Sequence, residues 1–184
     1  MIIVAGGDSF IWGSEMADSP HAGPNGFSRN TFTALLAKEH EYVCAAYPGN
    51  SNSQIVQGVK TALAEIHDNV GVIVLWSWPI RDHKFNSDRE IRDLQNFLDE
   101  RNLPYMFVCA DNCVVSGRLD YSKWFMFPPG VGANQTETPR GFYQWAVENK
   151  YQVGPQNHPL EQAHLDASKL MQEKFNELVK KHLQ

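Results

Sequence analysis

The apolar and polar residues of this chain fall into two kinds of segment, which predict strands and helices in alternation. Short runs rich in β-branched and aromatic residues predict strands at 1–5, 41–46, 70–76 and 103–109. Apolar residues at helical spacing predict helices at 31–40, 51–67, 87–101 and 141–150, and a long helix that begins at Pro159. This alternation is typical of a single α/β domain, residues 1–184, with a doubly wound and mainly parallel sheet.

Three further stretches complete this pattern. The uninterrupted apolar run at 70–76 favours a central strand that is covered on both faces. Residues 14–29 contain prolines, glycines and scattered polar side chains, so they predict a loop. Residues 111–154 carry little periodicity apart from the helix at 141–150, and nothing in them indicates a substrate.

Composition excludes several classes of protein. The formal net charge is −5 at pH 7, which gives no support to nucleic acid or an anionic membrane as a partner. The sequence has no signal-peptide pattern and no apolar run long enough to span a bilayer, so we expect a cytoplasmic protein. The three cysteines, Cys44, Cys109 and Cys113, lack the paired spacing of a zinc site, so we expect free thiols and no metal.

The first predicted strand runs directly into Gly6, Gly7, Asp8 and Ser9. In an open α/β sheet, ligands and catalytic groups gather beyond the carboxyl ends of the strands. A serine in such a turn can present its hydroxyl while nearby backbone N–H groups stay free to stabilise an oxyanion. The same residues also suit an ordinary turn with a capping side chain, and Asp8 is expected to hold that turn rather than to act on substrate.

The segment Gly7-Asp8-Ser9-Phe10, so close to the N-terminus, resembles the first sequence block of the SGNH/GDSL hydrolases, which are esterases and lipases. The resemblance implies a flavodoxin-like three-layer sandwich with about five mainly parallel strands and helices on both faces. It also implies that Ser9 is the nucleophile and that the Ser9 N–H belongs to the oxyanion hole.

Two later turns extend the resemblance in part. The turn after the second strand resembles the family's second block and implies that the Gly49 N–H is an oxyanion donor, although its residues also suit any helix start. After the third strand the family usually has Gly-x-Asn-Asp, whereas this chain has Trp-Ser-Trp-Pro-Ile-Arg at 76–81, a form that resembles divergent phage-encoded members. The asparagine donor is therefore missing, and the side chains expected to replace it are Asn52, Asn50 and Ser77.

The aromatic and basic residues of this third turn each have two interpretations. Trp76 and Trp78 are expected to line a substrate pocket, because aromatic rings offer a large flat contact area, unless one of them packs in the core. Arg81 is expected to bind an anionic group of the substrate or to form a surface salt bridge.

The histidine before the last helix resembles the family's catalytic base. His158 is followed by Pro159, as is usual in the family, but the aspartate expected three residues before the histidine is replaced by Pro155. In one interpretation His158 is the base, and a backbone carbonyl or another acid orients its ring. In the other, Glu161 and His164 form a displaced acid–histidine pair, although an ordinary surface pair or a buried His164 would also explain them.

The resemblance implies an ester hydrolase that forms an acyl-enzyme on Ser9 and needs no cofactor, with a small-molecule or carbohydrate ester as substrate. Because the aspartate and the asparagine are missing, a catalytically impaired module that binds carbohydrate or protein is the alternative. A nucleotide or flavin binder of flavodoxin type is a third, less well supported reading, because the first turn lacks the Ser/Thr/Gly run suited to phosphate.

Overall fold

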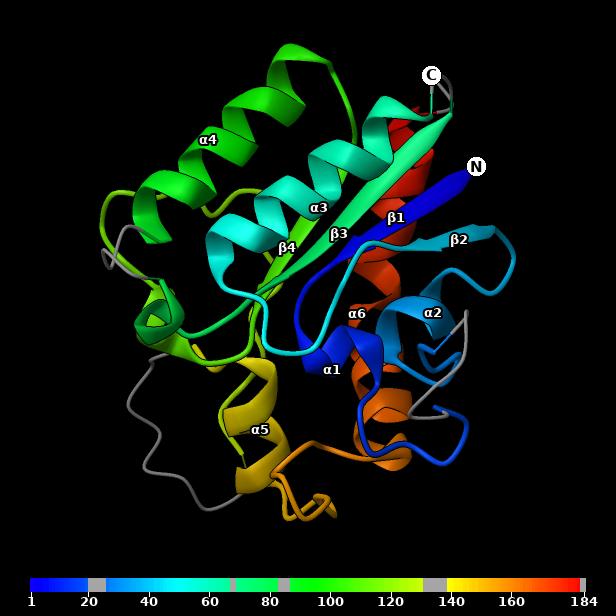
Figure 1. Ribbon diagram of the computed structural model, residues 1–184, viewed down its shortest axis with the longest axis vertical. Coiled ribbons are helices and arrows are strands. Elements are labelled where there is room, and N and C mark those ends of the chain that lie inside the picture. The colour runs from blue at the N-terminus through cyan, green and yellow to red at the C-terminus, as the bar shows by residue number, and fades with distance from the viewer. Residues whose placement is uncertain (20–25, 67–68, 83–86, 131–138, 183–184) are drawn as a thin grey trace.

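The computed structural model describes residues 1–19, 26–66, 69–82, 87–130 and 139–182. Within these ranges, four parallel strands form one sheet in the order β2-β1-β3-β4 (Figure 1). The strands are β1 (Ile2–Gly6), β2 (Glu41–Cys44), β3 (Val70–Trp76) and β4 (Tyr105–Cys109). β1 and β3 are the central pair of strands. Gly6, the last residue of β1, lies opposite Val74, near the end of β3.

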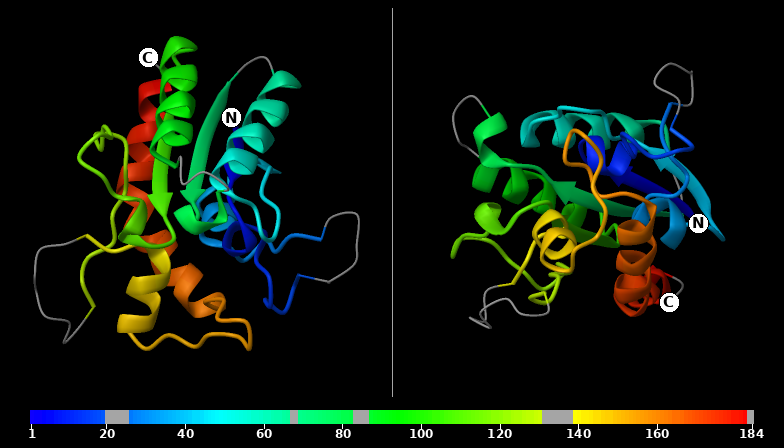
Figure 2. Two further views of the ribbon diagram at one scale, coloured as in Figure 1. Left: turned by 60° about the vertical axis from the view of Figure 1, so that its left-hand side comes forward. Right: turned by 90° about the horizontal axis from the view of Figure 1, so that it is seen from below.

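The helices cover both faces of this sheet (Figure 2). They are α1 (Ser9–Trp12), α2 (Phe32–Leu36), α3 (Asn52–Ala64), η1 (Pro79–Arg81), α4 (Ser87–Glu100), η2 (Asn112–Val114), α5 (Phe142–Glu148) and α6 (Glu161–His182). One core joins the sheet to α1, α2, α5 and α6 through Ile73 and Leu75, and the other joins it to α3 and α4 through Val72 and Val74. This alternation of side chains along β3 confirms the predicted three-layer α/β fold.

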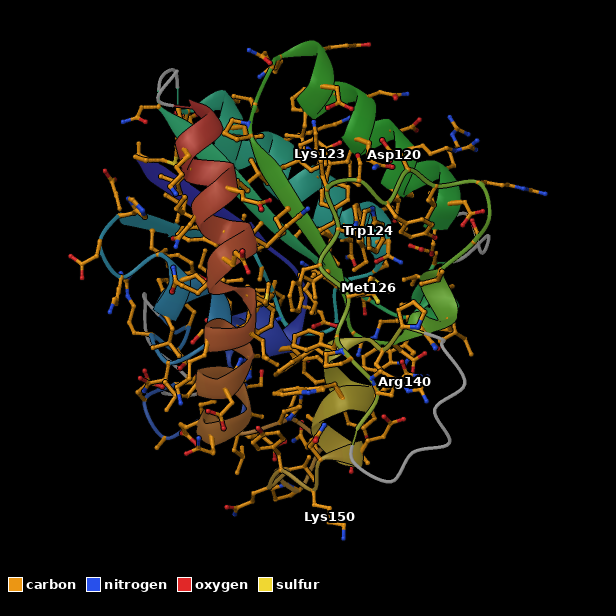
Figure 3. All side chains as sticks on the ribbon, turned by 180° about the vertical axis from the view of Figure 1, so that it is seen from behind. Asp120, Lys123, Trp124, Met126, Arg140 and Lys150 are labelled. Carbon is orange, nitrogen blue, oxygen red and sulfur yellow. The ribbon has the colours of Figure 1, made fainter. Side chains whose placement is uncertain are left out.

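The edge beyond β4 differs from the expectation of about five strands. In the described residues a single parallel bridge between Phe107 and Trp124 stands where a fifth strand would pair with β4. The backbone N–H of Phe107 donates to the Lys123 carbonyl at 3.0 Å, and the N–H of Phe125 donates to the Phe107 carbonyl at 2.8 Å. Figure 3 shows Lys123, Trp124 and Met126 along this segment. The ladder does not continue, because the Phe127 N–H donates to the Arg140 carbonyl at 3.0 Å in an antiparallel bridge instead of pairing with β4.

The remaining findings concern membranes, metals and thiols. In the described part of the chain, no helix is long and apolar enough to cross a membrane. Nor do any three His, Cys, Asp or Glu side chains of those residues gather in a way that could hold a metal ion. Cys44, Cys109 and Cys113 are free, and Cys113 is exposed.

Candidate active site

Ser9 is the first residue of α1 and directly follows the turn, Gly7 and Asp8, that joins α1 to β1. Figure 1 shows α1 below the ends of β1 and β3. Asp8 caps α1 by accepting a hydrogen bond from the Phe10 N–H at 3.0 Å. Gly7 allows the sharp turn, since an added Cβ would lie 2.4 Å from Ile11 Cγ1. Ser9 is the first residue of α1, so its N–H has no partner within the helix, and neither this N–H nor the hydroxyl donates a hydrogen bond to the described residues.

A cavity of about 360 Å³ opens beside Ser9. Ser9 and Phe10 line it from α1, Tyr143 from α5, and residues 156–158 from the loop before α6. The turn after β3 contributes Trp78, Ile80 and Arg81. The structure therefore brings Ser9 and His158, which are 149 positions apart in the sequence, to one cavity at the carboxyl edge of the sheet.

His158 has an acidic partner from the opposite end of the chain. Its Nδ1 lies 2.5 Å from Oε2 of Glu15, and the two side chains are each only 11% exposed. Both carboxylate oxygens of Glu15 also accept the Gln156 N–H at 3.0 Å. Partial burial opposes ionisation of Glu15, but the hydrogen bonds from His158 and Gln156 outweigh it and lower the pKa of the carboxyl below its usual value.

Backbone geometry on both sides supports this contact. Glu15 adopts a left-handed conformation with φ of 68°, which turns the loop after α1 back toward residues 154–158. Gly154 packs directly against the carboxylate, because a Cβ there would lie 2.7 Å from Glu15 Cδ. The 154–158 loop is closed by bonds from the Gly154 N–H to the His158 carbonyl and from the Asn157 N–H to the Gly154 carbonyl, at 2.8 and 2.9 Å. The imidazole is therefore held on a rigid loop.

This arrangement fixes the chemistry available to His158. When Nδ1 carries the proton that it shares with Glu15, Nε2 is an acceptor, which is the state that a general base requires. Phe10 packs edge-on against the imidazole with ring centroids 5.5 Å apart, which restrains the ring further. His158 and Glu15 are thus hydrogen-bonded beside the cavity that Ser9 also lines, and the acid is not where the resemblance placed it.

Glu15 was missed from the sequence. The resemblance places the acid at position 155, and the pattern at 14–29 predicts only a loop. The available signal is that Glu15 is the first acidic residue after Ser9 and lies in the loop that follows it. No sequence spacing, however, joins it to a histidine 143 residues later.

The displaced pair of Glu161 and His164 does not form. His164 is 1% exposed, stacks on Phe32 and accepts the Phe32 N–H on Nδ1 at 3.1 Å. Burial lowers the pKa of His164 to about 3, so the side chain is neutral. Glu161 instead accepts the Ala17 N–H at 2.7 Å. His164 belongs to the core, and Glu161 anchors the loop that carries Glu15.

The residues of the second turn lie outside the cavity lining. Gly49 is exposed, with φ of 81°, in a turn closed by the Asn50 N–H and the Tyr47 carbonyl. The Asn50 amide donates to the Gly7 carbonyl at 3.1 Å. Asn52 is fully buried, and its amide donates to the Ser77 carbonyl and the Ser87 hydroxyl at 3.0 and 2.8 Å. Both amide protons of Asn52 are used in these bonds, so Asn52 has none to offer an oxyanion while they hold.

The third turn is tied to the first. The buried Asp8 carboxylate accepts hydrogen bonds from the Ser77 hydroxyl at 2.7 Å and from Arg81 Nη1 at 2.8 Å. Asp8 thus holds the turn, and Ser77 donates to Asp8 instead of facing the cavity. The two tryptophans separate: Trp78 lines the cavity, whereas Trp76 is fully buried and packs edge-on against Phe107. Of the two interpretations given for these tryptophans, Trp76 follows the one in which a ring packs in the core, because as part of β3 it points into the core on the α3–α4 side.

No protein-family model matches the sequence, and no curated protein matches it significantly. Solved structures of similar fold include two esterases. One is the psychrotrophic esterase EstA from Pseudoalteromonas, solved as the form inhibited by monoethylphosphonate, with a TM-score of 0.61 at 11% identity over 99% of this chain and 98% of that one. The other is a two-domain esterase active on acetylated mannans, co-crystallised with mannopentaose, with a TM-score of 0.62 at 11% identity over 98% of this chain and 50% of that one. At these identities the likeness shows that the chain shares its fold with esterases.

Proposed function

We propose that this protein is a serine ester hydrolase of the SGNH/GDSL type, with Ser9 as nucleophile, His158 as general base and Glu15 as the acid that orients His158. The observation that carries the proposal is the bond between Glu15 and His158 Nδ1, beside a cavity that Ser9 also lines. The shared fold with two esterases supports it. The impaired binding module was the alternative because both the usual aspartate and the usual asparagine donor are missing, and Glu15 answers the first of these two reasons.

The reaction follows from these roles. His158 Nε2 takes the proton of the Ser9 hydroxyl, and Ser9 Oγ attacks the ester carbonyl carbon. The oxyanion that forms is stabilised by the Ser9 N–H, which has no partner within α1. The tetrahedral intermediate breaks the bond to the alcohol, which leaves with the proton held by His158. Water then gives a proton to His158 and attacks the acyl-enzyme, releasing the carboxylic acid and restoring Ser9. Glu15 stabilises the imidazolium in both steps.

The substrate class follows from the cavity. Its volume of about 360 Å³ suits a small ester or one unit of a larger one. Trp78 and Tyr143 provide aromatic surface on its walls, as is common where sugars or acyl groups bind. We therefore propose a small-molecule or carbohydrate ester, and acetylated sugars are the first compounds to test because one esterase of the same fold acts on acetylated mannans.

A fluorophosphonate probe tests the nucleophile directly. We expect the probe to label the wild type on Ser9, and a short-chain aryl ester to be hydrolysed. Ser9→Ala should lose both signals, and His158→Ala should lose turnover, whereas His164→Gln should keep both. Failure of the folded wild type to label or to hydrolyse a panel of short esters would refute the hydrolase proposal and favour the binding module.

A further inference from the structure

Arg81 gives the cavity beside Ser9 a positive charge. Among the described residues that line this cavity, Arg81 is the one with a permanent charge, since the others are apolar, neutral polar or, for His158, required neutral as a base. Glu15 lies behind His158 and does not line the cavity. Arg81 is paired with the buried Asp8 at 2.8 Å, so what faces the cavity is the cationic end of this ion pair.

The guanidinium of Arg81 is held in place before any ligand binds. Nη1 donates to Asp8 Oδ2 at 2.8 Å and to Ser77 Oγ at 2.9 Å. The group also lies over the Trp78 ring, 5.2 Å from its centroid. A side chain fixed in this way loses little conformational entropy when it binds a ligand, which favours affinity.

Part of the hydrogen-bonding capacity of Arg81 remains unused. A guanidinium carries five N–H groups, and both bonds of Arg81 to the described residues leave from Nη1. Nε and Nη2 make none within the described part of the chain, and the side chain is 31% exposed. Its partner Asp8 is 0% exposed, so an anion in the cavity approaches the guanidinium more closely than it approaches the carboxylate.

We propose that Arg81 is an anion-binding group of the substrate pocket, and that the preferred esters carry a carboxylate near the scissile bond. This inference rests on the proposed function, because it specifies the substrate class of the same site. The planar fork of an arginine matches the two oxygens of a carboxylate, which gives a stronger hydrogen bond than a neutral partner would. Arg81 is hydrogen-bonded to Asp8, which precedes Ser9 in the sequence. A carboxylate that binds Arg81 therefore has to lie on the substrate within a few bonds of the ester.

The test compares matched esters. 4-Acetoxybenzoate and 4-acetoxybenzamide have the same acyl group and similar phenol leaving groups, and the 3-substituted isomers place the same groups at another angle. We expect the wild type to prefer the carboxylate over the amide in kcat/KM by about tenfold for at least one isomer pair, as a charge-assisted hydrogen bond allows. Arg81→Gln should lose this preference, and Arg81→Lys should keep part of it.

The ratio of kcat/KM for the carboxylate ester to kcat/KM for the amide ester distinguishes loss of anion binding from a general loss of activity. Any effect of Arg81→Gln on Asp8 and the Ser9 turn lowers both rates and cancels in the ratio. Arg89→Gln is the matched control, because Arg89 is an exposed arginine on α4 and its loss changes the net charge equally. An equal ratio in the wild type and Arg81→Gln would overturn the proposal.

Calorimetry with the Ser9→Ala variant gives a readout that does not depend on turnover. We expect 4-acetoxybenzoate to bind Ser9→Ala about tenfold more tightly than it binds the Ser9→Ala, Arg81→Gln double variant. Equal affinity would overturn the role of Arg81 even if the protein is an esterase. Tighter binding to Ser9→Ala by a protein whose wild type hydrolyses no ester would instead support the anion site and refute the proposed function.

Discussion

Replacing Glu15 by glutamine tests the acid of the proposed site with little change in shape. The substitution keeps the length of the side chain but removes the charge that faces His158 Nδ1 at 2.5 Å. A glutamine can also turn its NH₂ group toward Nδ1, which favours the tautomer with the proton on Nε2. A histidine in that tautomer cannot accept the proton of Ser9.

The size of the effect can be worked from the geometry. Two unit charges about 4 Å apart interact by about 4 kcal/mol at an effective dielectric constant near 20. Both side chains are 11% exposed, so solvent screens the pair only weakly. Because each 1.36 kcal/mol corresponds to a factor of ten, losing this stabilisation of the imidazolium lowers kcat by about 10³-fold. The unfavourable tautomer adds to this, and an amide in place of the acid of a serine–histidine–aspartate triad costs about 10⁴-fold.

The assay is steady-state hydrolysis of a neutral aryl ester at neutral pH. We expect kcat to fall with KM nearly unchanged, since Glu15 does not line the cavity. Glu161→Gln is the matched control, because Glu161 is an acid that also contacts this loop and its glutamine keeps an oxygen for the Ala17 N–H. If a folded Glu15→Gln protein keeps more than a tenth of the wild-type kcat, the proposed role of Glu15 is wrong.

The same variant has a signature in stability. The pKa of Glu15 is lowered in the folded protein, so its ionised form contributes stability at pH values above the ordinary glutamate pKa, and this contribution is lost as the pH falls through the lowered value. The difference in melting temperature between wild type and Glu15→Gln is therefore expected to be full at neutral pH and to disappear in acid. A difference that grows on acidification would contradict the observed hydrogen bonds.

Three further substitutions test neighbouring parts of the structure. Gly154→Ala would place a Cβ 2.7 Å from Glu15 Cδ, and because the carboxylate is the part that can move, kcat should fall by about 10²-fold in ester hydrolysis. Asn52→Ala breaks three buried bonds, two to Ser77 and one to Ser87, and should cost about 3 kcal/mol in urea unfolding. His164→Gln should keep kcat within about threefold. Because burial lowers the pKa of His164 to about 3, wild-type stability should fall by about 1.4 kcal/mol per pH unit below about 6.5, a loss that the variant lacks.

The sequence predicted well those strands and helices whose position follows from the local order of apolar and polar residues. The apolar run at 70–76 became β3 with the same bounds, because every residue of that strand is buried on one face or the other. The predicted helix at 51–67 appears as α3, with Ser51 and Gln54 forming a capping box. The helix at 31–40 was too long by several residues, since α2 begins after the cap Thr31 and ends at Leu36.

The parts that failed depend on contacts between distant segments. The sequence could not tell which of Trp76 and Trp78 is buried, because the two residues are only two positions apart. Trp76 is the last residue of β3 and is buried in the core, whereas Trp78 follows the strand and lines the cavity. The resemblance implies a fifth strand. At the edge of the sheet beyond β4, residues 123–125 pair with Phe107 through one bridge only, and the extent of this pairing depends on tertiary contacts. Neither outcome is encoded in a local pattern.

The position of Glu15 follows from the same principle, and it gives the proposed site an acid although none stands three residues before His158. An acid three residues before His158 would belong to the histidine's own loop and would need little tertiary structure to meet it. Here the acid comes from the loop after the nucleophile, so the orientation of the imidazole depends on the packing of that loop against residues 154–158. Glu161 supports this packing by binding Ala17 from the first turn of α6. The contact between Glu15 and His158 therefore forms only when the two ends of the chain have folded against each other, and in the proposed site Glu15 supplies the charge that an aspartate at position 155 would supply.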